Sequence, residues 1–208
     1  MTAPSRVGVV CVAIAVLAAM LAWRADGQPR ADVSIVCQPG TQRGFAARAS
    51  GREEWCERPG SNPRILDGPF VSRHADGAIE TRDEYRDGKP SGPWKSWHPG
   101  GAQSGEVTFV GGKPNGMLLG WYPSGQASFI VGFRDGAPMG TLETFDAAGR
   151  MRTTVDFGAD GRERSRRAWD DANHEIDPRS REAVEAEQRA VASSPLIHMA
   201  LMASSIGR

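Results

Sequence analysis

Histidine, tyrosine and aspartate side chains recur at intervals of 24 residues, at His74, His98, Tyr122 and Asp146. Side chains of these types act as metal ligands or as general acids and bases. If the interval reflects successive β-hairpins, equivalent positions lie two strands apart, roughly 9–10 Å. Two imidazoles at that separation are too far apart to bind one zinc ion at about 2 Å each. We therefore predict that His74 and His98 are structural turn residues, and we expect no metal site.

No catalytic or cofactor-binding motif occurs elsewhere in the sequence. The nucleophile elbow G-x-S-x-G, the phosphate-binding P-loop, the metalloprotease motif H-E-x-x-H and the glycine-rich dinucleotide fingerprint are all absent. The adjacent carboxylates Asp170 and Asp171 lie in a charged stretch that we interpret as solvated. We therefore expect a protein that is not an enzyme, with no catalytic residues, no cofactor and no small-molecule substrate.

The three cysteines are Cys11, Cys37 and Cys56. Cys11 lies in an apolar N-terminal segment, which leaves Cys37 and Cys56 as an even pair in the rest of the chain. An even number of cysteines is typical of exported domains that contain disulfides. We predict a Cys37–Cys56 disulfide, with two free thiols or half of a metal site as alternatives. The metal site is the weaker alternative, because there is no C-x-x-C pair and no nearby histidine.

The N-terminus has the pattern of an export signal. Arg6 precedes an uncharged run of 17 residues from Val7 to Trp23, which ends at Arg24. This length is close to the minimum for a membrane-spanning helix and slightly longer than a typical signal-peptide core. A cleaved signal peptide and a short membrane anchor, with its linker to residue 30, both fit. Both predict that the rest of the chain is exported, in the periplasm or attached to the envelope.

Composition indicates one β-rich domain without a strong electrostatic field. Lysine and arginine together number 25, as do aspartate and glutamate, so the formal net charge is zero. This balance leaves no basic footprint for nucleic acid, and we expect no nucleic-acid partner. Hydrophobic residues make up 39% of the chain, which also has 25 glycines and 14 prolines. Such a composition suits many short strands and tight turns.

His74, His98, Tyr122 and Asp146 belong to a repeat of 24 residues that occupies residues 67–170. Four units begin at Gly68, Gly92, Gly116 and Gly140. Other columns with the same interval are glycines at Gly77, Gly101, Gly125 and Gly149, aromatic residues at Tyr85, Phe109, Phe133 and Phe157, and prolines at Pro90, Pro114 and Pro138. Several columns held without insertion or deletion indicate a repeat array.

Each unit predicts a β-hairpin. The segment Gly92–Gly101 has the pattern of a short strand and a tight turn, whose final glycine suits a left-handed residue. The second strand alternates with period two, because Val107 and Phe109 point one way and Glu106 and Thr108 point the other. The predicted fold class is therefore mainly β: an array of hairpin repeats in one meandering antiparallel sheet of about eight or nine strands.

Two columns of large residues run through the first strands, at Phe70, Trp94, Leu118 and Leu142, and at Arg73, Trp97, Trp121 and Phe145. Positions three apart cannot share one face of a flat strand. Either a bulge or twist brings the columns together, or one column makes the second face apolar. Trp169 continues the second column and predicts a degraded fifth first strand at residues 166–170.

A disulfide-tied cap is predicted before the array, at residues 31–66. A repeat array needs a cap, because its outermost unit otherwise leaves a row of unpaired backbone groups. We predict a short strand at residues 33–37, a loop at residues 38–52 and a second strand at residues 53–57, around Trp55.

A helical tail is predicted after the array, at residues 171–208. Asp177-Pro178 predicts the start of one helix, and Ser194-Pro195 predicts the start of a second, apolar helix. We expect this second helix to pack on the open end or on a face of the array, with membrane contact as the alternative.

The unit GPWKSWHPGGAQSGEVTFVGGKPN resembles the bacterial MORN-variant repeat, which starts G-x-W-x-x-W-x-x-x-G and ends aromatic-x-x-G-x-P. Proteins that carry this repeat are often labelled YwqK-family antitoxins. The similarity covers about residues 68–161 and is greatest in units two and three, because Arg73 and His74 replace aromatic residues in unit one. The resemblance implies β-hairpin arrays that contact proteins or membranes and share no catalytic residues. The antitoxin label implies neutralisation of a toxin.

Together these patterns predict a non-catalytic exported repeat protein that presents an aromatic sheet surface to another protein or to an envelope component. The residues that we expect to form this surface are Trp94, Trp97, Trp121, Tyr122 and Phe145. One alternative is an antitoxin or immunity-type inhibitor of a toxin, and another is a glycan-binding protein that uses the tryptophan row. Membrane contact, if any, would be made by residues 7–23.

Overall fold

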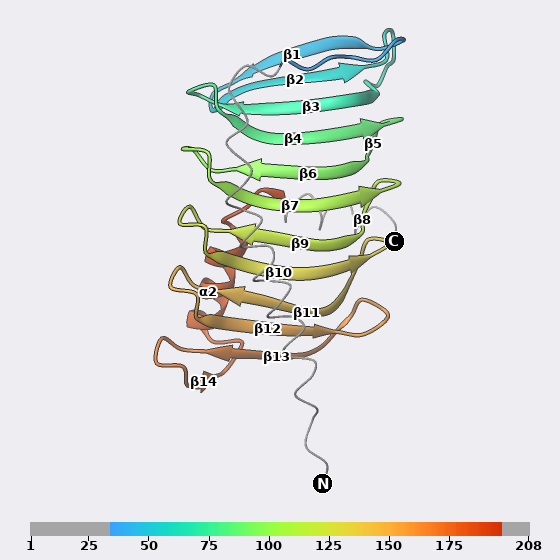
Figure 1. Ribbon diagram of the computed structural model, residues 1–208. Coiled ribbons are helices and arrows are strands. Elements are labelled where there is room, and N and C mark those ends of the chain that lie inside the picture. The colour runs from blue at the N-terminus through green and yellow to red at the C-terminus, as the bar shows by residue number, and fades with distance from the viewer. Residues whose placement is uncertain (1–33, 197–208) are drawn as a thin grey trace. The chain divides into compact units, whose positions relative to one another are not determined.

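The structure is a computed structural model, and it describes residues 34–196 of the 208-residue chain. The predicted export segment lies outside these residues, as does the predicted second helix beyond Leu196. The described part folds into one antiparallel sheet of 14 strands that meanders in chain order and is followed by one helix (Figure 1). This architecture confirms the predicted fold class.

The strands are β1 (Gln42–Arg48), β2 (Gly51–Glu57), β3 (Leu66–His74), β4 (Ile79–Arg86), β5 (Lys89–Pro90), β6 (Gly92–Trp97), β7 (Gln103–Val110), β8 (Lys113–Pro114), β9 (Gly116–Trp121), β10 (Ala127–Arg134), β11 (Ala137–Phe145), β12 (Met151–Phe157), β13 (Glu163–Trp169) and β14 (Glu175–Ile176). The helix α2 spans Arg181–Val191. The two-residue strands β5 and β8 pair only with β4 and β7. The repeat array has more strands than the eight or nine predicted because the very short strands β5 and β8 carry no sequence signal of a strand.

Each repeat unit forms a β-hairpin, as predicted, and each hairpin contains a β-bulge. In the second unit Ser96 pairs with Gly105 and Trp97 pairs with Gln103, so Ser104 is an extra residue in β7. Ser104 Oγ donates to Ser96 Oγ at 2.7 Å, which places Ser104 on the same face as Ser96. The equivalent extra residues of the other units are Glu80, Ser128 and Arg152.

The turn glycines adopt the left-handed backbone conformation that the sequence predicts. Gly77, Gly101, Gly125 and Gly149 have φ of 89°, 86°, 83° and 81°. The next position of this column is Asn173, whose φ is also positive, at 63°. Asparagine is among the few residues other than glycine that adopt this conformation readily. The predicted fifth first strand is present as β13, and it forms a truncated fifth hairpin with β14.

The two columns of large residues lie on opposite faces of the sheet. Trp94 and Leu118 are fully buried on one face, in a cluster that includes Leu196 after α2. We name it the helix face. Trp97 and Trp121 lie three residues after Trp94 and Leu118 on strands that contain no extra residue. Because side chains alternate between the two faces along a strand, Trp97 and Trp121 lie on the other face. We name this second face the open face. The bulges lie in the second strands, so they do not bring the columns together.

α2 lies across β10, β11 and β12 on the helix face, behind the sheet in the view of Figure 1. It buries three alanines, Ala183, Ala186 and Ala190, whose small side chains allow the helix to approach the sheet closely. Just after the helix, the Oγ atom of Ser194 lies 3.3 Å from the Oγ atom of Ser96. α2 and the residues that follow it up to Leu196 thus pack on one face of the array.

The predicted start of this helix at Pro178 is wrong. The N-cap is Ser180, whose Oγ accepts a hydrogen bond from the Ala183 amide. The Asp177 carboxylate instead accepts from the Arg179 amide and closes a separate turn before the helix. A capping side chain followed by proline is compatible with both arrangements, so the sequence pattern did not distinguish them.

The prediction for the cap is partly wrong. Residues 34–41 contain no strand, and β1 lies where the sequence predicted a loop. β1 is exposed at most of its positions, so it lacks the alternation that identifies a strand with one covered face. Its pairing with β2 is what makes it a strand. β2 contains the predicted strand at residues 53–57.

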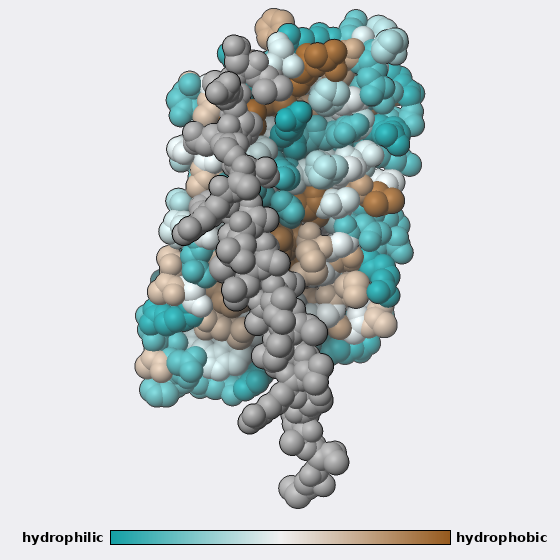
Figure 2. Space-filling model, viewed as in Figure 1, coloured by the Kyte–Doolittle hydropathy of each residue, from teal (hydrophilic) through white to brown (hydrophobic). Residues whose placement is uncertain are grey.

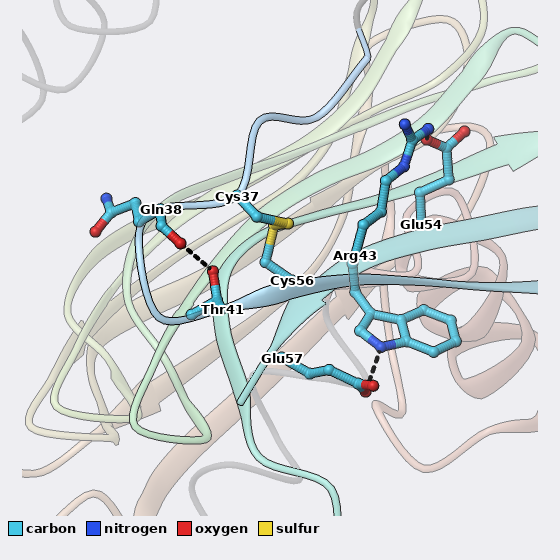
Figure 3. The surroundings of a disulfide bond; sticks show 8 residues. Cys37, Gln38, Thr41, Arg43, Glu54, Cys56 and Glu57 are labelled. Atoms are coloured by element: carbon cyan, nitrogen blue, oxygen red, sulfur yellow. Dashed lines mark hydrogen bonds and ion pairs between the residues drawn. A yellow bond between two sulfur atoms is a disulfide. The ribbon is translucent and has the colours of Figure 1, made fainter. Parts of the chain in front are cut away.

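The predicted disulfide is present and joins Cys37, in the segment before β1, to Cys56 in β2 (Figure 3). The two Cα atoms are 5.5 Å apart. The bond holds the preceding residues on the sheet, where Ile35 packs with Val71 and Ile79 in a small cluster. Trp97 packs against the same cluster on the open face. The cap therefore covers the open face at units one and two.

Candidate protein-binding surface

The histidine column joins successive hairpins. His74 Nε2 lies 3.0 Å from the Trp97 carbonyl oxygen, and His98 Nε2 lies 2.7 Å from the Trp121 carbonyl oxygen. Because a carbonyl oxygen can only accept, each Nε2 carries the proton and donates. The structure thus places both histidines in the structural turn role that the sequence predicts.

Tyr122 and Arg152 continue this ladder of hydrogen bonds. The Tyr122 hydroxyl donates to the Phe145 carbonyl at 2.8 Å. Asp146, the next residue of the column, can only accept, and its carboxylate accepts from amides of its own turn. Arg152 Nε takes over the donor role and bonds to the Trp169 carbonyl at 3.0 Å. Each hairpin is therefore fastened to the next at its turn end.

The ionisation of this column suits hydrogen bonding better than acid–base chemistry. Burial raises the pKa of the Tyr122 hydroxyl, which keeps the hydroxyl protonated and able to donate. Burial opposes ionisation of Asp146, but hydrogen bonds from the Arg150 amide and guanidinium lower its pKa overall. Neither pKa is shifted toward neutral pH, where the pKa of an effective general acid or base lies.

Residues 34–196 lack two other kinds of functional feature. In this range no cluster of three or more histidine, cysteine, aspartate or glutamate side chains is placed to hold a metal ion. Nor does any helix of this range have the length and apolar character needed to cross a membrane.

The aromatic residues that the sequence assigned to a binding surface have different surroundings. Trp94 is 0% exposed, and the centroid of its indole ring lies 4.6 Å from the centroid of the Phe109 phenyl ring, so Trp94 belongs to the core of the helix face. Trp97 packs on the cap, and the Tyr122 hydroxyl is used in the ladder. Trp121 and the side chain of Phe145 are half-buried at the turn end of the open face. The structure therefore does not bring the five residues together into one exposed row.

A second apolar group on the open face was missed by the sequence analysis. Met117 pairs with Gly132, Leu119 pairs with Ile130, and Gly132 pairs with Met139, so these side chains share one face. A Cβ added at Gly132 would lie 3.3 Å from Met139 Cγ and 3.8 Å from Met117 Sδ. Both methionines thus flank the same glycine. We name Met117, Leu119, Ile130 and Met139 the unit 3 patch.

Exposure distinguishes the unit 3 patch from the core. Met117 is 52% exposed and Met139 is 37% exposed, whereas Ile130 is 7% exposed. Two flexible thioether side chains are therefore accessible above a buried isoleucine. Figure 2 shows brown, hydrophobic side chains among teal ones on the face that lies opposite α2.

The signal for this patch was present in the repeat alignment. Unit three carries Met117, Leu119 and Ile130 where unit two carries Pro93, Lys95 and Glu106. Alternation along one strand is compatible with either face being covered, so it did not reveal that unit three is apolar on both faces. Comparison of equivalent open-face positions between units would have identified the patch.

Charged groups border the unit 3 patch. Glu143 pairs with Ile130 across β10 and β11, and burial raises the pKa of its carboxyl group. On the other side Glu106 is the neighbour of Leu119 and lies 3.8 Å from the Lys95 ammonium. An apolar centre with a polar rim is the usual anatomy of a protein–protein interface.

No known protein family matches the chain, and no curated protein matches it. Among solved structures, the chain is similar to one in the crystal structure of accessory secretory proteins 1, 2 and 3 of Streptococcus pneumoniae, with 12% sequence identity and a TM-score of 0.32. The similarity covers 62% of this chain and 24% of that chain. At this TM-score the two chains share too little structure for the similarity to indicate a function.

Proposed function

We propose that this is a non-catalytic, exported repeat protein that binds another protein through the unit 3 patch. The observation that carries the proposal is the change from Pro93, Lys95 and Glu106 in unit two to three apolar residues in unit three. Unit two forms the same hairpin with polar residues at two of these positions, so the hairpin fold does not require apolar ones. A contiguous apolar area that folding does not require is typical of an interaction site.

The chemistry of the patch suits a protein partner. Methionine side chains are unbranched and polarizable, and they adapt to the shape of an apolar partner surface. The resemblance to MORN-variant repeats supports the same role, because it implies hairpin arrays that make protein contacts. The predicted export signal at residues 7–23 supports a partner outside the cytoplasm.

The test compares two matched substitutions of exposed apolar residues. Met117→Asp introduces a charge in the unit 3 patch, and Val184→Asp introduces one on α2, where Val184 is 42% exposed. Both variants should melt at the temperature of the wild-type chain, because neither side chain is buried. The immobilised chains are then incubated with the envelope fraction of the source cell, and retained proteins are quantified by mass spectrometry.

We expect the wild-type chain and Val184→Asp to retain the same protein, and Met117→Asp to retain at least about tenfold less of it, because a buried charge without a partner opposes association. Equal retention by Met117→Asp would show that the unit 3 patch is not the binding surface. Failure of the wild-type chain to retain any protein would also contradict the proposal.

A further inference from the structure

β1 leaves one edge of the sheet without a partner strand in the part of the chain that the structure describes (Figure 1). The amide and carbonyl groups along such an edge pair readily with another strand. The two most exposed large apolar side chains of the described residues are at this end, Phe45 at 83% and Val36 at 82%. Phe45 is the central residue of the seven-residue strand β1.

The arginines of β1 do not protect this edge. Charged side chains on an edge strand usually prevent it from pairing with another molecule. Here Arg43 is paired with Glu54 of the neighbouring strand. Arg48 is paired with Glu53 at 3.2 Å and with Glu80 at 2.6 Å. Both cations are therefore neutralised by carboxylates of their own sheet.

The opposite end of the sheet is better protected. β14 pairs with Ala168 and Trp169 and covers part of the outer edge of β13. The remaining residues of β13, which begins at Glu163, include three arginines and one serine. A head-to-tail contact would place β1 against this charged and partly covered strand. Contact between two copies of β1 avoids that strand.

We propose that β1 pairs with β1 of a second copy of this chain, antiparallel and about a two-fold axis at Phe45. In this register Gln42 lies opposite Arg48 of the second copy, Arg43 lies opposite Ala47, and Phe45 lies opposite Phe45. No arginine lies opposite an arginine, and the two exposed phenylalanines form a cross-strand aromatic pair. The contact is self-complementary, as a two-fold dimer interface requires.

The dimer has a consequence for the proposed function, although it does not depend on it. Antiparallel pairing within one sheet places the two-fold axis perpendicular to that sheet. The open faces of both copies then lie on the same side. The two unit 3 patches therefore point in the same direction, and a multivalent partner or surface binds both with increased avidity.

The test uses the fact that residue 45 lies opposite itself. Phe45→Glu and Phe45→Lys each place two like charges face to face, whereas a mixture of the two variants places opposite charges face to face. Val110→Glu and Val110→Lys are the matched controls, because Val110 is also an exposed apolar strand residue, at 61%. Sedimentation velocity of the full chain at about 1–200 µM measures association in a range suited to small interfaces.

We expect the wild-type chain and both Val110 variants to dimerise. Each Phe45 variant alone should associate at least about tenfold more weakly, and the mixture should recover the dimer. Circular dichroism should show that all variants are folded, since neither residue is buried. A monomeric wild-type chain, a mixture that stays monomeric, or assemblies larger than a dimer would each overturn the proposal. These results do not depend on Met117, so they are independent of the test of the unit 3 patch.

Discussion

His98 donates a hydrogen bond from Nε2 to the backbone carbonyl oxygen of Trp121, 2.7 Å away and one hairpin further along the array. The backbone pairing between these two hairpins is short, because only two residue pairs join β7 to β9. The side-chain bond fastens the hairpins at the turn end, beyond the paired residues. A column of residues that could perform acid–base chemistry thus serves to hold the repeat array together.

Loss of the His98 donor should destabilise the fold modestly. His98→Phe removes the donor but keeps a ring, whereas His98→Tyr restores a donor of the kind that Tyr122 uses in the next unit. We expect His98→Phe to lower the free energy of unfolding by about 1 kcal/mol, the usual net value of one hydrogen bond. His98→Tyr should retain most of it. Denaturant unfolding measures both, and equal losses in the two variants would assign the effect to the ring and not to the bond.

The glycine at position 77 should matter through its backbone conformation alone. Gly77 has φ of 89°, and a Cβ added there would meet no atom within 4 Å. Gly77→Val should therefore cost more than about 1 kcal/mol through backbone strain, because β-branched residues are poor in this region. Gly77→Asn should cost clearly less, since Asn173 adopts the same conformation in the fifth hairpin. Equal melting temperatures for the two variants would contradict this account of the turn.

The two tryptophan columns should differ in their contribution to stability. Trp94→Ala removes a fully buried indole from the helix face and should cost about 3–5 kcal/mol. Trp121→Ala removes a half-buried indole from the open face and should cost less than half as much. The His98 bond persists in Trp121→Ala because it reaches the backbone carbonyl. Chemical denaturation of the two variants gives the comparison, and a similar loss in both would mean that the open face is core.

Asp83 should make the stability of the fold depend on pH. Burial raises the pKa of its carboxyl group from an ordinary value of 3.8 to about 7, although a hydrogen bond from Thr81 acts in the opposite direction. Its Oδ1 atom has no hydrogen-bond partner. Between these two pKa values the folded state holds a proton that the unfolded state has released. Stability contributed by Asp83 is therefore full below about pH 4 and is lost as pH rises through about 7.

The variant Asp83→Asn should remove this pH dependence. The loss in the wild-type chain is on the order of 4 kcal/mol for a shift of this size. We expect Asp83→Asn to be more stable than the wild-type chain at pH 8 and to lose less stability between pH 5 and pH 8. Urea denaturation across this range measures the difference. Parallel curves for the two chains would show that Asp83 is not the responsible group.

Much of the fold was predictable because its signals are local and repeated. The glycine at each turn, exemplified by Gly101, depends only on the backbone conformation of that residue. The alternation of Val107 and Phe109 depends only on the period of a strand. The Cys37–Cys56 bond followed from an even pair of cysteines. Each inference needed no knowledge of which distant segment lies nearby.

The sequence by itself therefore determined the repeat period, the hairpins, the turn glycines and the disulfide. The tertiary structure decided which face of the sheet is covered, because that depends on where α2 and Leu196 pack, far from the first units in sequence. It assigned Trp94 to the core and left Met117 exposed, although both belong to equivalent first strands. It also made β1 a strand, since an exposed edge strand has no covered face to create a pattern and is defined only by its pairing with β2.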